Sequence, residues 1–188
     1  MFRFVALLFA MILAGTCAAQ DAATKPATAG AVAPDRNYRL GAGDEVDISV
    51  YGEKDLSMSA RIGDNGRISY PFLGEMLVAG LSLDQVEKKV RDALAGDYLV
   101  DPRVTVSVTA YRPFFVNGQV RSPGSYPFQP GMTVRKAISL AGGLTERASE
   151  RKITLIPEAQ KAANKGRGVS MDDAVGPGDI ITVDESFF

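Results

Sequence analysis

The sequence contains no histidine, and this absence excludes several kinds of catalysis at once. Ser-His-Asp and Cys-His mechanisms both need an imidazole base. The only cysteine, Cys17, lies in an N-terminal segment that we do not expect to fold, so a zinc site is disfavoured and an internal disulfide is impossible. No pair of carboxylates has a spacing that indicates an acid and a base. We therefore expect a protein that is not an enzyme and that uses no cofactor and no metal.

The chain also lacks a charge excess of either sign. It has 21 basic and 22 acidic residues, which gives a net charge of -1. Nucleic-acid-binding proteins need a basic face, and no stripe of basic and aromatic residues is present, so nucleic acid is excluded as a partner. The length of 188 residues and a hydrophobic content of 46% are typical of one or two small globular domains.

The N-terminus has the pattern of a secretory signal peptide, which we place at residues 1–19. Arg3 is followed by an apolar run over 4–13 and then by small residues, and the run is too short to span a bilayer. Cys17 has two interpretations. Residues 14–17 form a degenerate lipoprotein box in which Cys17 would be lipidated, whereas residues 17–19 also fit an ordinary signal peptidase site. Residues 20–36 are rich in Ala, Thr and Pro and are predicted to form a flexible tether.

A first folded region is predicted over 37–111. Apolar and polar residues alternate over 45–51 and again over 104–109, as in half-buried strands. Asp64-Asn65-Gly66 stands between two strand-like runs and predicts a hairpin, because Asn-Gly accepts positive φ. Ser82 and Gln85 have the spacing of a capping box at the start of a helix that Gly96 would end.

A second folded region is predicted over 112–188. Pro123-Gly124 should turn one strand back on the next, and Thr133 should cap a short helix that Gly142-Gly143 ends. The aromatic residues of this region are expected in its core: Phe114, Phe115, Tyr126 and Phe128. Strands around single helices, without regular β-α-β alternation, predict an α+β fold of two small β-rich domains, each with one main helix.

One turn pattern occurs twice, in "RLGAGDEVDISV" and in "VGPGDIITV". A dinucleotide fingerprint is excluded at the first, because the residues after Gly41 and Gly43 alternate as in a strand instead of opening a helix. We interpret both as tight turns in which Gly supplies backbone freedom and the Asp, Asp44 or Asp179, bonds the local backbone. Gly43 and Gly124 are expected to hold conformations that a Cβ would strain.

The motifs of the first region resemble those of the polysaccharide biosynthesis/export domain of bacterial outer-membrane polysaccharide export proteins. The resemblance covers "YRLGAGDEVDISV", "RIGDNGRISYPFLGEMLVAGLSLDQ" and "DPRVTVSV". The residues that carry it are Gly41, Gly43, Asp44, Asp64, Gly66, Pro71, Gly74, Gly80 and Pro102. The second region resembles the companion soluble-ligand-binding β-grasp (SLBB) domain through Gly118, Pro123, Gly124, Gly142 and Gly143, and a second Gly-x-Gly-Asp turn at Gly178 and Asp179 precedes the closing strand.

The resemblance implies that the second domain is β-grasp-like and that the protein is a component of a capsule or exopolysaccharide export complex. Such proteins assemble as rings that form a passive conduit for the polymer. The implied partners are other copies of the chain, an inner-membrane polysaccharide co-polymerase and a separate outer-membrane β-barrel protein, and the implied location is the periplasm at the outer membrane. The sequence fits a short form with one SLBB domain and no C-terminal membrane-spanning helix. A monomeric periplasmic glycan- or ligand-binding module is the alternative.

Overall fold

Alternating apolar residues form the first folded region, residues 38–110, around a three-stranded antiparallel sheet. The protein is seen here in a computed structural model that describes residues 38–96, 98–163 and 165–186. The elements of this region are β1 (Glu45–Val50), the 3-10 helix η1 (Lys54–Leu56), β2 (Met58–Arg61), β3 (Arg67–Tyr70), β4 (Gly74–Leu77), α1 (Leu83–Leu94) and β5 (Val104–Ala110). The sheet has the order β2-β1-β5.

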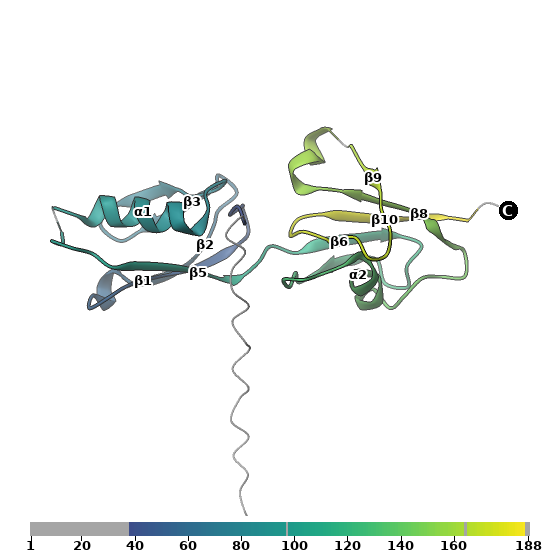
Figure 1. Ribbon diagram of the computed structural model, residues 1–188, viewed down its shortest axis with the longest axis horizontal. Coiled ribbons are helices and arrows are strands. Elements are labelled where there is room, and N and C mark those ends of the chain that lie inside the picture. The colour runs from purple at the N-terminus through teal and green to yellow at the C-terminus, as the bar shows by residue number, and fades with distance from the viewer. Residues whose placement is uncertain (1–37, 97, 164, 187–188) are drawn as a thin grey trace, which may run out of the picture. The chain divides into compact units, whose positions relative to one another are not determined.

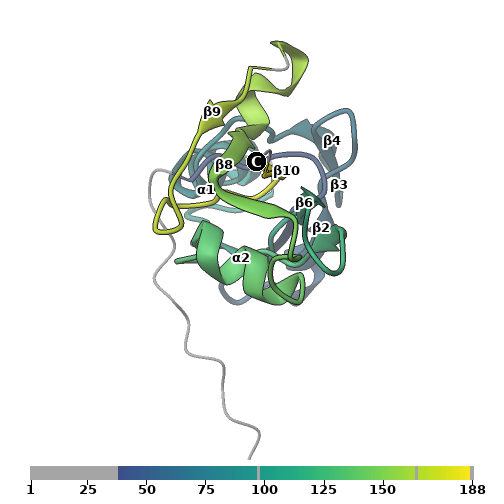
Figure 2. The ribbon, with the colours of Figure 1, turned by 90° about the vertical axis from the view of Figure 1, so that its right-hand side faces the viewer.

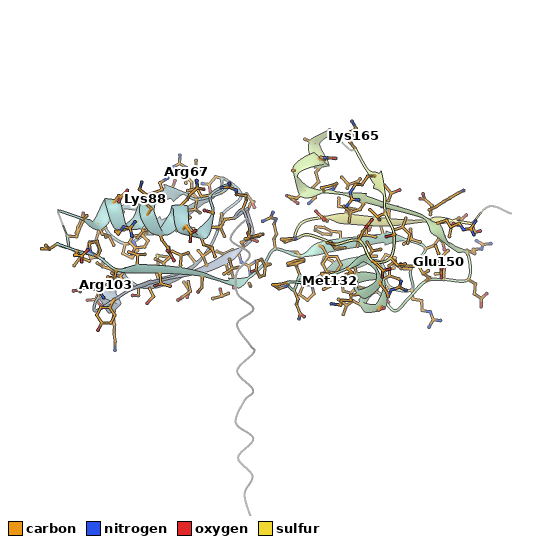
Figure 3. The ribbon with its side chains drawn as sticks, viewed as in Figure 1. Arg67, Lys88, Arg103, Met132, Glu150 and Lys165 are labelled. Atoms are coloured by element: carbon orange, nitrogen blue, oxygen red, sulfur yellow. The ribbon has the colours of Figure 1, made fainter. Side chains whose placement is uncertain are left out.

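Helix α1 covers the apolar face of this sheet (Figure 1). The Ser82 side chain accepts a hydrogen bond from the Gln85 backbone and the Gln85 side chain accepts one from the Ser82 backbone, so the predicted capping box is confirmed. The predicted stop is confirmed as well, since Ala95 is the C-cap and Gly96 has φ +95°. The apolar stripe of the helix is buried, while Lys88 lies on the face turned away from the sheet (Figure 3).

The predicted hairpin at Asp64-Asn65-Gly66 is wrong, although a tight turn does form there. Gly66 has φ +74°, and its backbone N–H donates to Gly63 O. The strands on either side join different partners, because β2 pairs with β1 whereas β3 pairs with β4. The true hairpin is therefore β3–β4, and its turn contains Pro71, Phe72 and Leu73.

The second folded region, residues 112–186, has a five-stranded sheet in the order β7-β6-β10-β8-β9. Its elements are β6 (Phe114–Gly118), β7 (Gly124–Tyr126), α2 (Val134–Leu140), β8 (Ala148–Ile156), the 3-10 helix η2 (Glu158–Ala163), β9 (Arg167–Gly168) and β10 (Ile180–Glu185). The closing strand β10 is parallel to β6 and antiparallel to β8, so the last strand of the sequence lies in the middle of the sheet. The predicted α+β class is confirmed.

The second apolar core lies between α2 and this sheet. Thr133 caps α2 by accepting a hydrogen bond from the Lys136 backbone, as predicted, and Val134, Ala137 and Ile138 are buried against strand residues. Figures 1 and 2 show β9 on the opposite side of β6, β10 and β8 from α2. The two regions have separate cores, and the domain bounds given above stay a prediction.

Two expectations about the β6–β7 hairpin need correction. The hairpin itself forms, with Phe114 opposite Tyr126. Phe114 is buried, but Phe115 points to the other face and is 36% exposed, because successive strand residues alternate. Gly124 has no positive φ, and a Cβ there would meet nothing within 4 Å, so the expected strain at this glycine is absent.

Candidate functional site at the junction of the two regions

The turn at Gly41-Ala42-Gly43-Asp44 is closed by the side chain of its own aspartate. The Asp44 N–H donates to Gly41 O at 3.2 Å, and Asp44 Oδ2 accepts from the Gly41 N–H at 2.9 Å. Gly43 has φ +91°, a conformation in which a side chain is strained. The chain then enters β1 with Asp44 fully buried at its start.

The turn before β10 has the same hydrogen bonds. The Asp179 N–H donates to Gly176 O at 3.3 Å, Asp179 Oδ2 accepts from the Gly176 N–H at 2.7 Å, and Gly178 has φ +84°. Asp179 Oδ1 also accepts from the Glu158 N–H at 3.0 Å. The pattern that the sequence shows twice is thus one local structure formed twice. The strands that follow do not pair, since β1 and β10 belong to different sheets.

Arg112 joins the first turn to the second region. Its backbone N–H donates to Asp44 Oδ1 at 2.8 Å, and its Nη1 donates to Asp44 Oδ2 at 2.9 Å. Nη1 also donates to the Tyr38 hydroxyl at 2.9 Å, and that hydroxyl in turn donates to Asp44. The Arg112 side chain is only 15% exposed. Because Arg112 lies two residues before β6, this ion pair ties the start of the second sheet to the start of the first.

The second turn contacts the same guanidinium. A Cβ on Gly178 would lie 2.9 Å from Arg112 Nε and would overlap the Glu158 carboxylate. Glu158 Oε2 lies 2.6 Å from Lys161 Nζ, an ion pair whose angles are not those of a hydrogen bond. Arg112 Nε is buried and has no hydrogen-bond acceptor among the described residues. Both Gly-x-Gly-Asp turns therefore pack around one arginine.

Burial raises the pKa of two groups at this junction. Burial, helped by the hydrogen bond to Asp44, raises the pKa of the Tyr38 hydroxyl, so Tyr38 stays a neutral donor. Burial also raises the pKa of the Asp179 carboxyl above its ordinary value, and the hydrogen bonds from Gly176 and Glu158 and the charge of Arg112 partly offset this effect. These shifts follow from packing and need no catalytic role.

An aromatic-lined cavity of about 380 Å³ lies beside these turns. The rings of Tyr38 and Tyr111 meet edge to face at 5.1 Å, and those of Tyr111 and Phe128 do so at 5.4 Å. Its walls are largely apolar, formed by Tyr38, Tyr111, Phe128, Pro130, Gly131, Met132, Ala174, Val175, Gly176 and Pro177. The Tyr38 hydroxyl is occupied by Asp44 and Arg112, so the cavity presents ring faces and edges more than polar groups.

The residues singled out by the sequence do not gather at one site. Gly41, Gly43, Asp44, Gly178 and Asp179 meet at the junction. The others lie in separate turns: Asp64 and Gly66 before β3, Pro71 and Gly74 around the β3–β4 turn, Gly80 before α1, Pro102 before β5, Gly118 at the end of β6, Pro123 and Gly124 before and at the start of β7, and Gly142 and Gly143 after α2. Cys17 lies outside the described residues.

Sequence reasoning missed two features. Nothing in the sequence marks Arg112 as the residue that both turns contact. It also missed a pair of exposed aromatic side chains in the first region, Phe72 and Tyr98, which we call the exposed aromatic patch. Phe72 is 70% exposed with φ +63°, and its ring lies 6.1 Å from that of Tyr98, which is 47% exposed. The spacing of apolar residues along the sequence does not reveal a positive φ at a bulky residue in a turn, so Phe72 could not be predicted to be exposed.

Within the described parts of the chain, no group of His, Cys, Asp and Glu side chains could hold a metal ion. Among the same residues, no helix has both the length and the apolar character that crossing a membrane requires.

Comparison with known proteins identifies the class. The family model "Polysaccharide biosynthesis/export protein" matches residues 32–109, and the SLBB domain model matches residues 113–171. The chain belongs to the polysaccharide biosynthesis/export family.

The similar proteins are named for exopolysaccharides. The chain is 32% identical, over 57% of its length, to the exopolysaccharide production protein ExoF of Rhizobium meliloti. It is 26% identical, over 80% of its length, to the EPS I polysaccharide export outer membrane protein EpsA of Ralstonia nicotianae, and 29% identical over 57% to EpsA of Ralstonia solanacearum. The matches span 28%, 39% and 35% of these relatives, so the chain covers about a third of their length.

Proposed function

We propose that this chain is a periplasmic, outer-membrane-associated component of a capsule or exopolysaccharide export complex. In this proposal it forms a ring-shaped passive conduit for the polymer and catalyses no reaction. The observation that carries the proposal is the consecutive match of two family models over residues 32–171, together with relatives that are named for exopolysaccharide production and export.

The exposed aromatic patch supports assembly of several copies. Apolar side chains that stay exposed together often mark a surface that another molecule covers. A conduit needs a contact between unlike surfaces that closes after a fixed number of copies. The Arg112–Asp44 ion pair suits such an assembly, because within each copy it joins the start of the first sheet to the start of the second. We expect native mass spectrometry of gently extracted protein to give a single closed oligomer.

A matched pair of variants tests this surface. Phe72→Ser combined with Tyr98→Ser should shift the protein toward monomer, whereas Leu140→Ser, an exposed apolar residue on α2 of the second region, should not. A chain that stays monomeric at all concentrations and in the presence of its partner complex would favour the alternative, a monomeric glycan- or ligand-binding module. The aromatic-lined cavity is the observation that favours this alternative, because aromatic rings are suited to contact a ligand.

Passive transport does not require a tight binding site for the polymer. A passage must bind its cargo weakly, because tight sites would stall a moving chain. The force would come from inner-membrane machinery, and we propose an inner-membrane co-polymerase and a separate outer-membrane protein as partners. If Cys17 is lipidated, residues 20–36 would tether the ring to the membrane. Labelling with a fatty-acid analogue in wild type and Cys17→Ser distinguishes the two interpretations of Cys17.

Deletion of the gene is the test of the function. We expect surface or secreted polysaccharide to be lost while sugar-nucleotide precursors stay at their normal levels, and a plasmid copy of the gene should restore export. Normal polysaccharide export in the deletion strain would refute the proposal. Turnover of a glycan by the purified chain would refute its non-enzymatic part.

A further inference from the structure

A shallow depression of about 510 Å³ lies in the second region, between the end of β6 and the loop that follows α2. None of its lining residues takes part in the hydrogen bonds described at the junction. Six side chains line it: Gln119, Arg121, Leu144, Thr145, Glu146 and Arg147.

Backbone hydrogen bonds hold the two walls of the depression together. The Arg121 N–H donates to Gly143 O at 3.0 Å, the Ser122 N–H to Ala141 O at 2.9 Å, and the Thr145 N–H to Gln119 O at 3.2 Å. A Cβ on Gly142 would lie 3.2 Å from Arg121 Cβ, so a glycine here leaves room for the arginine stem. Gly142 and Gly143, which the sequence singles out, thus form part of this wall.

A chain of side-chain hydrogen bonds fixes the polar part of the depression. The Thr145 hydroxyl donates to Gln119 Oε1 at 2.7 Å, and Gln119 Nε2 donates to Glu185 Oε1 at 2.8 Å. A hydroxyl oxygen has two lone pairs and an amide nitrogen has two hydrogens. Thr145 and Gln119 therefore keep acceptor and donor capacity for a ligand while their orientation is held.

The guanidinium groups of the two arginines in the depression have no partner among the residues that the structure describes. Neither Arg121 nor Arg147 makes a side-chain hydrogen bond or ion pair with any described residue, although Glu146 lies on the same depression. A guanidinium is a planar fork that matches a carboxylate in two parallel hydrogen bonds. Leu144 adds apolar surface between these polar groups.

We propose that this depression binds a carboxylate-bearing sugar unit of the exported polysaccharide, an inference that rests on the proposed function. Arg121 and Arg147 hold the carboxylate, Gln119 and Thr145 hydrogen-bond ring hydroxyls, and the C–H face of the sugar lies on Leu144. The depression is open and its arginines are exposed, so water competes for each contact and binding is weak. Weak binding suits a polymer that must move on.

The test is an NMR titration of the isotope-labelled chain with trigalacturonate, with neutral maltotriose and with inorganic phosphate. The acidic sugar should shift the amide signals of Gln119, Thr145 and Arg147 in a saturable way, and the other two probes should not. Arg121→Gln combined with Arg147→Gln should weaken the acidic sugar at least tenfold. The matched control, Arg103→Gln combined with Arg151→Gln, removes two exposed charges elsewhere and should leave binding unchanged.

Three outcomes would overturn the inference without touching the proposed function. They are equal shifts from neutral and acidic sugars, equal shifts from phosphate, or an equal loss of binding in the control pair. A cell assay separates the two proposals. If the double variant at Arg121 and Arg147 restores full export of an acidic polymer to the deletion strain, the inference fails alone, whereas export by the deletion strain itself refutes the function.

Discussion

Replacement of Asp44 by alanine would leave the Arg112 guanidinium in the junction without its anion. Asp44 is fully buried and accepts hydrogen bonds from Gly41, from Tyr38 and twice from Arg112. Breaking a buried ion pair by removing one partner costs about 3–5 kcal/mol. We expect a loss of that size in the free energy of unfolding, a large share of the roughly 5–15 kcal/mol that holds a typical domain folded.

Arg112→Met should cost less than Asp44→Ala. In this variant the Asp44 carboxylate keeps the backbone N–H groups of Gly41 and residue 112 and the Tyr38 hydroxyl as donors. A buried group that loses one hydrogen-bond partner costs about 1–3 kcal/mol, and more when it is charged, so we expect a loss of about 3 kcal/mol, at the lower end of the range for Asp44→Ala. The ordering of the two variants is therefore as informative as either value, because Asp44 has several hydrogen-bond donors, whereas the Arg112 guanidinium donates to one carboxylate among the described residues.

Urea unfolding followed by far-UV circular dichroism measures both free energies by linear extrapolation, since the chain has no tryptophan to report fluorescence. The control is Asp172→Ala, which breaks an exposed ion pair with Arg135 and should cost less than about 1 kcal/mol. If Asp44→Ala destabilises the protein no more than Asp172→Ala, the view of the junction as a buried, charge-linked contact is wrong.

Three further predictions use the same unfolding assay. Gly43→Val should lower the free energy of unfolding by about 1–3 kcal/mol, because φ at Gly43 is +91°. Gly124→Val should change it by no more than about 0.5 kcal/mol, because Gly124 has no positive φ. Equal effects of the two substitutions would contradict the assigned turn conformations. Gly118→Ala should be more damaging than Gly43→Val, because its Cβ would overlap the Val183 carbonyl where β6 meets β10, and a smaller loss would count against that close approach. Burial raises the pKa of Asp179 above its ordinary 3.8, so the folded state binds this proton more tightly than the unfolded state does. The protonated Asp179 therefore stabilises the folded state fully below pH 3.8, and this contribution is lost as the pH rises through the raised pKa. The stability of Asp179→Asn relative to the parent chain should therefore rise as the pH increases from below 3.8 through the raised pKa, and a difference that does not change with pH would refute the sign.

Local signals in the sequence predicted both helices well. The caps at Ser82 and Thr133 depend on a side chain and a backbone N–H only three residues apart, so their geometry is set almost entirely by neighbours in the chain. The Gly-x-Gly-Asp turns are local for the same reason, since Asp44 and Asp179 each bond the residue three positions earlier. These elements could be predicted without knowing what surrounds them.

Strand pairing and the junction depended on residues far apart in the chain. Asp64-Asn65-Gly66 does turn the backbone, but β2 pairs with β1 and β3 with β4, a choice made by the burial of whole strands and not by turn chemistry. Phe115 could be assigned to the exposed face only once the partners of β6 were known.

Residue types at short, fixed spacings were enough to predict the α+β class, the helix caps, the two aspartate turns and the family resemblance. The meeting of both turns at Arg112, 68 residues after Asp44 and 67 before Asp179, could be seen only in the folded protein. The same holds for the exposed aromatic patch and for the depression at Arg121 and Arg147. Contacts across such separations exist only after two cores have formed and brought their surfaces together, so no short stretch of sequence contains them.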